Sequence, residues 1–192
     1  MAFNANEPPK NKPQELIPEG LYPARLARVI ELGDQEDRYG VKTKAVLAFT
    51  IPSQTMEIEG EQKQRMMMTF PLNQTSNPDA TLMKYMKALG GATWDDVLGK
   101  PCTIEISHKN VNGVERMNIT NVVKPMAGAD IPMPDCDMYV FDFENPNKEV
   151  FDKLSEYRQT EIKNAVNYQG SKVQSMLEGT SVSEATTEDS PI

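Results

Sequence analysis

The sequence has few of the residues from which most active sites are built. Its 192 residues include one histidine, His108, and two cysteines, Cys102 and Cys136. So few nitrogen and sulfur ligands do not favour a four-ligand zinc site, and two cysteines indicate a reducing compartment rather than a disulfide framework. The phosphate-binding motifs GxGxxG and GxxxxGKS/T do not occur. We therefore expect a protein that is not an enzyme and that uses neither a metal nor a cofactor.

Long apolar runs are missing as well. The N-terminal stretch MAFNANEPPKNKPQ contains no apolar segment typical of a signal peptide. No window approaches the ~18 consecutive apolar residues of a membrane-spanning helix. We expect a cytoplasmic protein that does not contact membranes.

The acidic residues are concentrated at one end of the chain. Residues 1–126 contain 15 basic and 15 acidic residues, whereas residues 127–192 contain 5 and 13, so the whole net charge of −8 lies in the C-terminal third. Like charges at a chain end usually form a solvated interaction tail. The neutral body argues against a DNA mimic, which would spread acid across its folded surface.

Alternation of apolar and polar residues predicts five strands, at 21–32, 42–51, 64–72, 102–107 and 114–123. In the first, Tyr22, Ala24, Leu26 and Ile30 share a face that also carries Arg28. The inward residues predicted for the others are Ala45, Leu47, Phe49 and Ile51, then Met66, Met68 and Phe70, then Cys102, Ile104 and Ile106, then Met117 and Ile119. The third strand would present Arg65, Met67 and Thr69 outward.

The connections are predicted from turn residues. Residues 33–40 and 53–63 are expected to be polar loops, and Asn112-Gly113 indicates a hairpin. A helix should begin after Ser76 or Asn77 and stop at Gly90-Gly91, with Leu82, Met83, Met86 and Leu89 on its apolar stripe.

This order of elements predicts a mainly β protein, a five-stranded OB-fold barrel with a helix between strands three and four. The expected segments are a flexible leader at 1–18, the OB-fold domain at 19–126, a linker and helical extension at 127–177, and a disordered acidic tail at 178–192. One helix is predicted from 148 to about 168. Tyr139, Phe141 and Phe143 either dock this extension or form a self-association surface, which makes a homo-oligomer a further expectation.

Proteins that bind single-stranded DNA combine basic groups along the backbone with flat side chains on which bases stack. Tyr39, a loop tyrosine, is the best stacking candidate, whereas Phe70 and Tyr22 are more readily core residues than stacking surfaces. Each cation alone is an ordinary surface residue, but their concentration on strands two, three and five favours a binding face. The candidate DNA-binding residues are Arg38, Tyr39, Lys42, Lys44, Lys63, Arg65, Lys109 and Arg116.

Other residues have competing interpretations. Asp95-Asp96 is more readily a solvated turn than a catalytic carboxylate pair, and His108 is more readily exposed and structural than an acid or base. Met67 is a soft apolar patch under a base if it faces outward, and Trp94 is expected to pack the end of the helix onto the barrel. The tail residues Glu184, Glu188, Asp189 and Ile192 would recruit partner proteins, compete for the basic groove, or merely keep the protein soluble.

Four segments between residues 17 and 126 resemble a family of phage-encoded OB-fold single-stranded DNA-binding proteins. They are IPEGLYPARLARV, YGVKTKAVLAFTI, MKALGGATWDDVLGKPCTIEI and NGVERMNITNVVKP. The resemblance implies sequence-tolerant binding of single-stranded DNA during phage replication or recombination in the host cytoplasm, with replication or recombination proteins as partners of the tail. The end at Ile192 differs from the aromatic end of bacterial single-strand binders. The alternative is a non-catalytic protein-interaction or assembly module on the same barrel.

Overall fold

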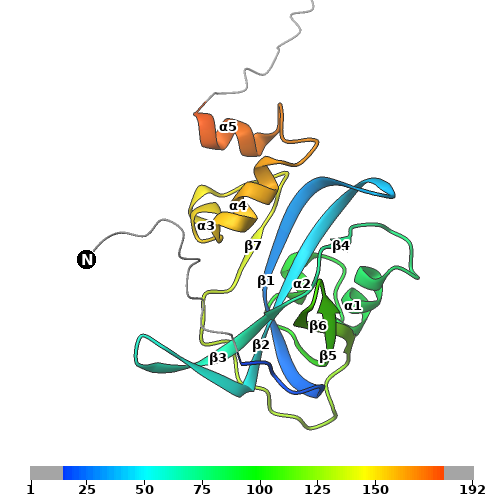
Figure 1. Cartoon of the computed structure of the whole chain (residues 1–192), viewed down its shortest axis with the longest axis vertical. Helices are drawn as coiled ribbons and strands as arrows, with labels where there is room; N and C mark the ends of the chain where they lie inside the picture. The colour runs from blue at the N-terminus through cyan, green and yellow to red at the C-terminus, as the bar shows by residue number, and fades with distance from the viewer. Residues whose placement is uncertain (1–14, 180–192) are drawn as a thin grey trace, which may run out of the picture.

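The computed structural model describes residues 15–179. Its main feature is a strongly curled antiparallel sheet that forms a half barrel, with a few short helices around it (Figure 1). The strands are β1 (Gly20–Asp37), β2 (Gly40–Ile58), β3 (Glu61–Met68), β4 (Leu72–Asn73), β5 (Pro101–Val111), β6 (Val114–Val123) and β7 (Tyr139–Phe141). The helices are α1 (Thr81–Leu89), α2 (Trp94–Val97), α3 (Lys148–Asp152), α4 (Glu156–Lys163) and α5 (Lys172–Glu178).

The strand order is β3-β2-β1-β5-β6, with β4 paired to β2 and β7 running parallel beside β1. The predicted hairpin between β5 and β6 is confirmed. Its two-residue turn is Asn112-Gly113, and both residues have positive φ. This is the backbone geometry for which an Asn-Gly pair is favoured.

The first three strands form two long hairpins at opposite ends of β2. β1 and β2 remain paired up to a two-residue turn, Arg38-Tyr39, and β2 and β3 up to the turn Glu59-Gly60. The prediction that residues 33–40 and 53–63 are loops is therefore wrong. Both segments are mostly paired strand, and their polar composition reflects hairpin ends that extend beyond the first core. Only Gly33 of these residues is buried, against Phe143 of the extension.

The first core lies inside the half barrel. The predicted inward residues of β2 and β5 are confirmed, because all of them are almost completely buried. Helix α1 covers one end with Leu82, Tyr85, Met86 and Leu89. Its C-terminal stop at Gly90 is confirmed, whereas its predicted start is wrong. The helix begins after Ala80, whose side chain cannot cap it. The predicted cap, Asn77, lies three residues earlier, and its amide oxygen accepts a hydrogen bond from the Asp79 backbone N–H instead.

β3 faces the opposite way from the sequence prediction. In the pair of β2 and β3, Phe49 lies opposite Met67, and directly opposed residues share one face. Because Phe49 is fully buried in the first core, Met67 also points inward, together with the residues two positions away on either side. The side chains buried for this reason are Arg65, Met67 and Thr69.

The prediction that Met66, Met68 and Phe70 form the core face is correspondingly wrong. Met68 and Phe70 are 38% and 44% exposed on the outer face of the sheet. A change of one residue in phase moves every side chain of a strand to the other face. Three consecutive methionines make both phases almost equally apolar, so that alternation alone selected the wrong one.

β1 contributes to both faces of the sheet because its pairing with β2 is irregular after Leu26 and again after Glu31. The first irregularity puts Val29 rather than Arg28 on the inner face. Ile30 therefore does not share a face with Leu26, as had been predicted, but packs in a second core on the outer side.

The second core joins the outer faces of β1 and β2 to the C-terminal extension. The docking role predicted for Tyr139, Phe141 and Phe143 is confirmed, since all three are buried there. The single helix predicted from 148 to about 168 is wrong. Ser155 interrupts it and starts α4 by accepting a hydrogen bond from the Arg158 backbone N–H.

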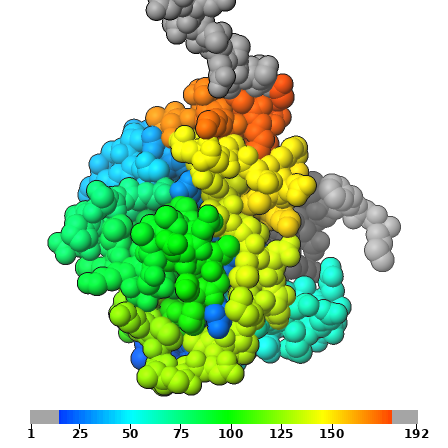
Figure 2. Space-filling model, turned by 180° about the vertical axis from the view of Figure 1, so that it is seen from behind, coloured from blue at the N-terminus to red at the C-terminus, as the bar shows by residue number. Residues whose placement is uncertain are grey.

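The linker before this extension is held against the sheet. Arg25 donates to the Ile131 carbonyl at 2.8 Å, Arg28 to the Asp137 carbonyl at 3.1 Å, and the Gln64 side chain to the Met133 carbonyl at 3.0 Å. Figure 2 shows the yellow-green linker and the yellow and orange extension wrapping one side of the molecule, so that blue β1 is visible only in patches. Much of the outer face of β1 is therefore unavailable to a ligand.

Candidate nucleic-acid interface

The turn between β1 and β2 brings together three of the predicted DNA-binding residues. The Tyr39 ring is 69% exposed. The Arg38 guanidinium lies 4.6 Å and the Lys42 ammonium 5.5 Å from the ring centre. Neither cation has an acidic ion-pair partner within residues 15–179. This hairpin end, the blue-to-cyan loop at the upper right of Figure 1, thus offers an aromatic face between two available positive charges.

Lys44 lies on the same hairpin but is already paired. Its ammonium is 2.6 Å from the Asp37 carboxylate, and its side chain is only 14% exposed. The hydrogen bond from Lys44, followed by one from the Tyr39 backbone N–H, lowers the pKa of Asp37. The ion pair therefore persists at neutral pH, and Lys44 is not free to neutralise a phosphate.

Two predicted residues on β3 are not brought to this end. Lys63 lies at the opposite end of the β2–β3 pair and forms an ion pair with Glu61 at 2.6 Å. Arg65 is 7% exposed, and its guanidinium donates to the Glu15 carbonyl at 2.6 Å. The prediction that Arg65 faces outward is wrong for the reason given above, and its observed role is to hold the segment before β1.

The other predicted cations lie on the β5–β6 hairpin. Lys109 and Arg116 are directly opposite each other across the two strands, and both are exposed without an ion-pair partner in the described part of the chain. His108 beside them is structural but only partly exposed. Its Nε2 lies 2.8 Å from the Ile17 carbonyl, and its Nδ1 lies 3.4 Å from Glu115.

The residues that sequence reasoning missed lie between these two hairpins. We call Met66, Met68 and Phe70 the β3 row, since the pairing of β2 and β3 places all three on the outer face of the sheet. Asn73 lies opposite Lys44, so the row begins near the β1–β2 hairpin. Met66 pairs with Thr50 and Asn73 with Lys44, six residues apart on β2, so at about 3.3 Å per residue the distance from Asn73 to Met66 is about 20 Å. Only the register of β3 against β2 could have revealed this row.

At its other end the β3 row reaches the gap between β3 and β6, which do not pair with each other. A cleft of about 580 Å³ opens there. It is lined by Met66, Met67 and Met68 on one side, by Val114, Glu115, Arg116 and Met117 on the other, and by Leu16. Arg116 therefore lines the same cleft as Met66 and Met68 of the β3 row.

The other candidate groups, Asp96, Trp94 and Cys102, have structural positions in the fold. Asp96 caps helix α2, accepting hydrogen bonds from the Ala92 and Thr93 backbone N–H groups. Trp94 packs against the first core, as predicted. Burial raises the pKa of the Cys102 thiol to about 12, so this thiol stays protonated at neutral pH.

Within residues 15–179, no three histidine, cysteine or acidic side chains gather closely enough to hold a metal ion. None of the helices that the structure describes is long and apolar enough to cross a membrane. The predicted tail residues Glu184, Glu188, Asp189 and Ile192 lie outside the described residues.

The chain matches no protein-family model, and no curated protein matches its sequence.

Proposed function

We propose that this protein is an OB-fold, non-catalytic protein that binds single-stranded DNA without strong sequence preference. The observation that carries the proposal is the β3 row, in which Met68 and Phe70 are exposed between two hairpins whose cations have no ion-pair partner within residues 15–179. Exposed apolar side chains in such a line have no role in the core. Next to available Arg and Lys side chains, they match the surface that a single strand requires.

The OB-fold assignment is supported by the order of the strands. β1, β2 and β3 are consecutive neighbours, and β5 and β6 continue on the other side of β1. Helix α1 lies between the third strand and the strand that pairs with β1 on that other side. The OB-fold has this sequence of strands, and its ligands commonly bind along the second and third strands and the adjoining loops.

In this arrangement the phosphates contact Arg38 and Lys42 at one end and Lys109 and Arg116 at the other. The bases lie against Tyr39 and the β3 row. Stacking on an aromatic ring contributes ~1–3 kcal/mol per base and tolerates every base, since each has a flat face. Duplex DNA would bind less well, because its bases are already stacked on one another.

We propose, from the resemblance noted for residues 17–126, that this activity serves phage DNA replication or recombination in the host cytoplasm. The acidic tail would then recruit replication or recombination proteins or compete for the cationic hairpins. Both roles are extensions of the DNA-binding proposal and depend on it.

The proposal is tested by the fluorescence anisotropy of a labelled oligo-dT of roughly 15 nucleotides, which is within the site size of such domains. The variant Met68→Ala with Phe70→Ala should weaken binding by about 5-fold or more, since it removes the stacking of at least one base. The matched control is Leu21→Ala, which removes an apolar side chain that is 67% exposed on β1, away from the row.

Unchanged binding by the double variant would contradict the β3 row as the binding surface. If the wild-type protein does not bind oligo-dT even at low salt, the alternative of a protein-interaction module on the same barrel is favoured.

A further inference from the structure

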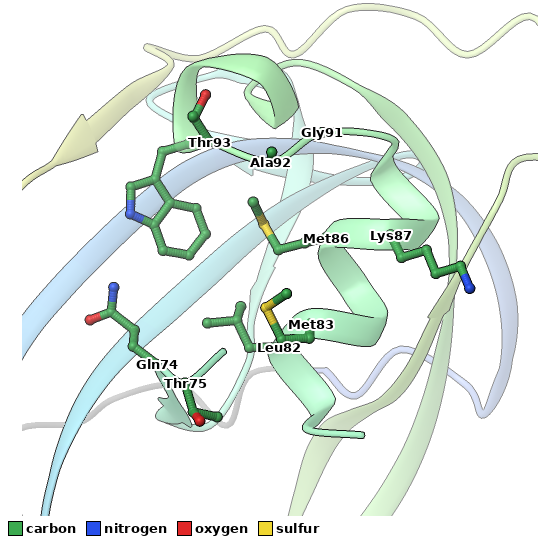
Figure 3. A pocket seen from close by; sticks show the side chains of 10 residues that line it. Gln74, Thr75, Leu82, Met83, Met86, Lys87, Gly91, Ala92 and Thr93 are labelled. Carbon is green, nitrogen blue, oxygen red and sulfur yellow. The ribbon is translucent and has the colours of Figure 1, made fainter. Parts of the chain in front are cut away.

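A second cavity of about 580 Å³ lies beside helix α1, on the other side of β4 from the β3 row. It is lined by Gln74, Thr75, Leu82, Met83, Met86, Lys87, Gly91, Ala92, Thr93 and Trp94. In Figure 3, Leu82, Met83 and Met86 project from α1 toward Gln74 and Thr75. The walls are thus mainly apolar, with hydroxyl and amide groups at the edges. This volume is within the range of sites that bind small organic groups.

The aromatic wall of this cavity is fixed in place. The indole Nε1 of Trp94 donates to Glu31 Oε1 at 2.7 Å, and the side-chain amide of Gln74 donates to the same oxygen at 2.8 Å. The other oxygen of Glu31 accepts a hydrogen bond from the Phe143 backbone N–H at 2.9 Å. Because Glu31 is bound from three elements, the Trp94 ring is preorganised and does not need to be ordered by a ligand.

We propose that this cavity accepts one unpaired base of the bound DNA strand, an inference that rests on the function proposed above. A flat base is the ligand that best uses an immobilised indole facing thioether and aliphatic side chains, since both kinds of wall favour contact with a π system. The hydroxyl oxygens of Thr75 and Thr93 accept hydrogen bonds from the Asn77 and Asp96 backbone N–H groups. Each hydroxyl keeps its own O–H as a donor for a base at the edge of the cavity.

Charge and position both favour nucleic acid as the occupant. Lys87 stands on the outer rim, where its side chain extends away from the cavity (Figure 3), and Lys84 is exposed on the same helix. These two ammonium groups can contact the phosphates on either side of an inserted base. The Gln74 backbone N–H donates to the Thr43 carbonyl, directly after Asn73, which pairs with Lys44. The cavity therefore begins one residue beyond the end of edge strand β4, four residues after Phe70 of the β3 row.

Trp94 makes the inference directly measurable, because it is the only tryptophan in the chain. Its fluorescence is followed while unlabelled oligo-dT is added, and the anisotropy of labelled oligo-dT is followed in a parallel titration. Base stacking should quench the indole emission along the same isotherm as the anisotropy rises. The bound oligonucleotide should also protect Trp94 from quenching by acrylamide.

A rim variant distinguishes insertion from an indirect effect. Met83→Glu places an anion at the mouth of the cavity without removing a fully buried side chain. It should weaken oligo-dT binding about 5-fold, the value of one lost stacking contact, and should reduce the quenching at saturation. The control Met126→Glu makes the same chemical change at a linker residue that is 74% exposed and should leave both unchanged.

The two proposals fail in different ways. If anisotropy shows tight binding while Trp94 emission and acrylamide access do not change, the base pocket is refuted and DNA binding stands. Equal affinities of Met83→Glu and Met126→Glu would refute it as well. The absence of any anisotropy change with the wild-type protein would refute DNA binding itself.

Discussion

Neutralising the two cations around Tyr39, by Arg38→Gln with Lys42→Gln, should make the log–log salt slope of DNA binding shallower by about 1.4. Both side chains are at the end of the β1–β2 hairpin, beyond the core, and neither forms an ion pair with another residue of the described chain. Their replacement should therefore leave the free energy of unfolding within about 0.5 kcal/mol of the wild-type value.

The magnitude follows from the number of cations that the structure leaves unpaired on the proposed path. These are Arg38, Lys42, Lys109 and Arg116, whereas Lys44 and Lys63 are held by Asp37 and Glu61. With about 0.7 counterions released per phosphate contact on a single strand, four contacts give a log–log salt slope of about −2.8 and two contacts about −1.4. Between about 50 and 200 mM salt, wild-type affinity should fall about 50-fold and that of the variant about 7-fold.

The assay is oligo-dT anisotropy over a series of salt concentrations. The control is Lys172→Gln, which removes an exposed charge from α5 on the extension and should keep the wild-type slope. A double variant with the wild-type slope would show that the hairpin end does not contact phosphate. If Lys84 and Lys87 beside the cavity also contact phosphates, both slopes become steeper by about 1.4, to about −4.2 for the wild-type protein and about −2.8 for the variant. A wild-type slope steeper than about −5 would mean that ion-paired lysines also take part, against the reasoning from the structure.

Three further outcomes are expected. Asp37→Asn should release Lys44 and steepen the salt slope of DNA binding by about 0.7, and an unchanged slope would show that Lys44 does not contact the DNA. The hydrogen bond with Lys44 lowers the pKa of Asp37, so in the wild-type protein the same release should occur only as pH falls through that lowered pKa. Gly33→Ala should destabilise the fold by about 1–3 kcal/mol in urea denaturation, since Gly33 has φ +71° and an added Cβ would lie 2.6 Å from the Phe143 ring; wild-type stability would contradict this packing of the extension. Arg65→Met should cost about 1.5–3 kcal/mol of stability, the contribution of a hydrogen bond from a charged group, yet leave the salt slope unchanged; a shallower slope would restore Arg65 to the DNA-binding set.

The sequence by itself determined the elements whose signals are local. The inward residues of β2 and β5 were predicted because large apolar residues recur at every second position, with Phe49 and Ile104 fully buried. Alternation did not reveal that Val46, on the other face of β2, is buried as well. The Asn112-Gly113 turn and the stop of α1 at Gly90 were predicted because these backbone conformations select their residues. The exposure of Tyr39 was predicted because a tyrosine in a polar loop has no periodic reason to be buried.

Tertiary structure alone decided which face of β3 is buried and which cations remain available. The run Met66–Met68 is apolar in either phase, so the inward residue was set by its partner Phe49 on β2. Whether a lysine is free depends on an acid elsewhere in the chain, as Asp37 is for Lys44. Likewise, nothing local in the sequence around Trp94 reveals that Glu31, 63 positions away in the chain, fixes its ring. Alternation and composition describe single segments, whereas the proposed interface and the cavity are made by pairs of segments that only the folded sheet brings into contact.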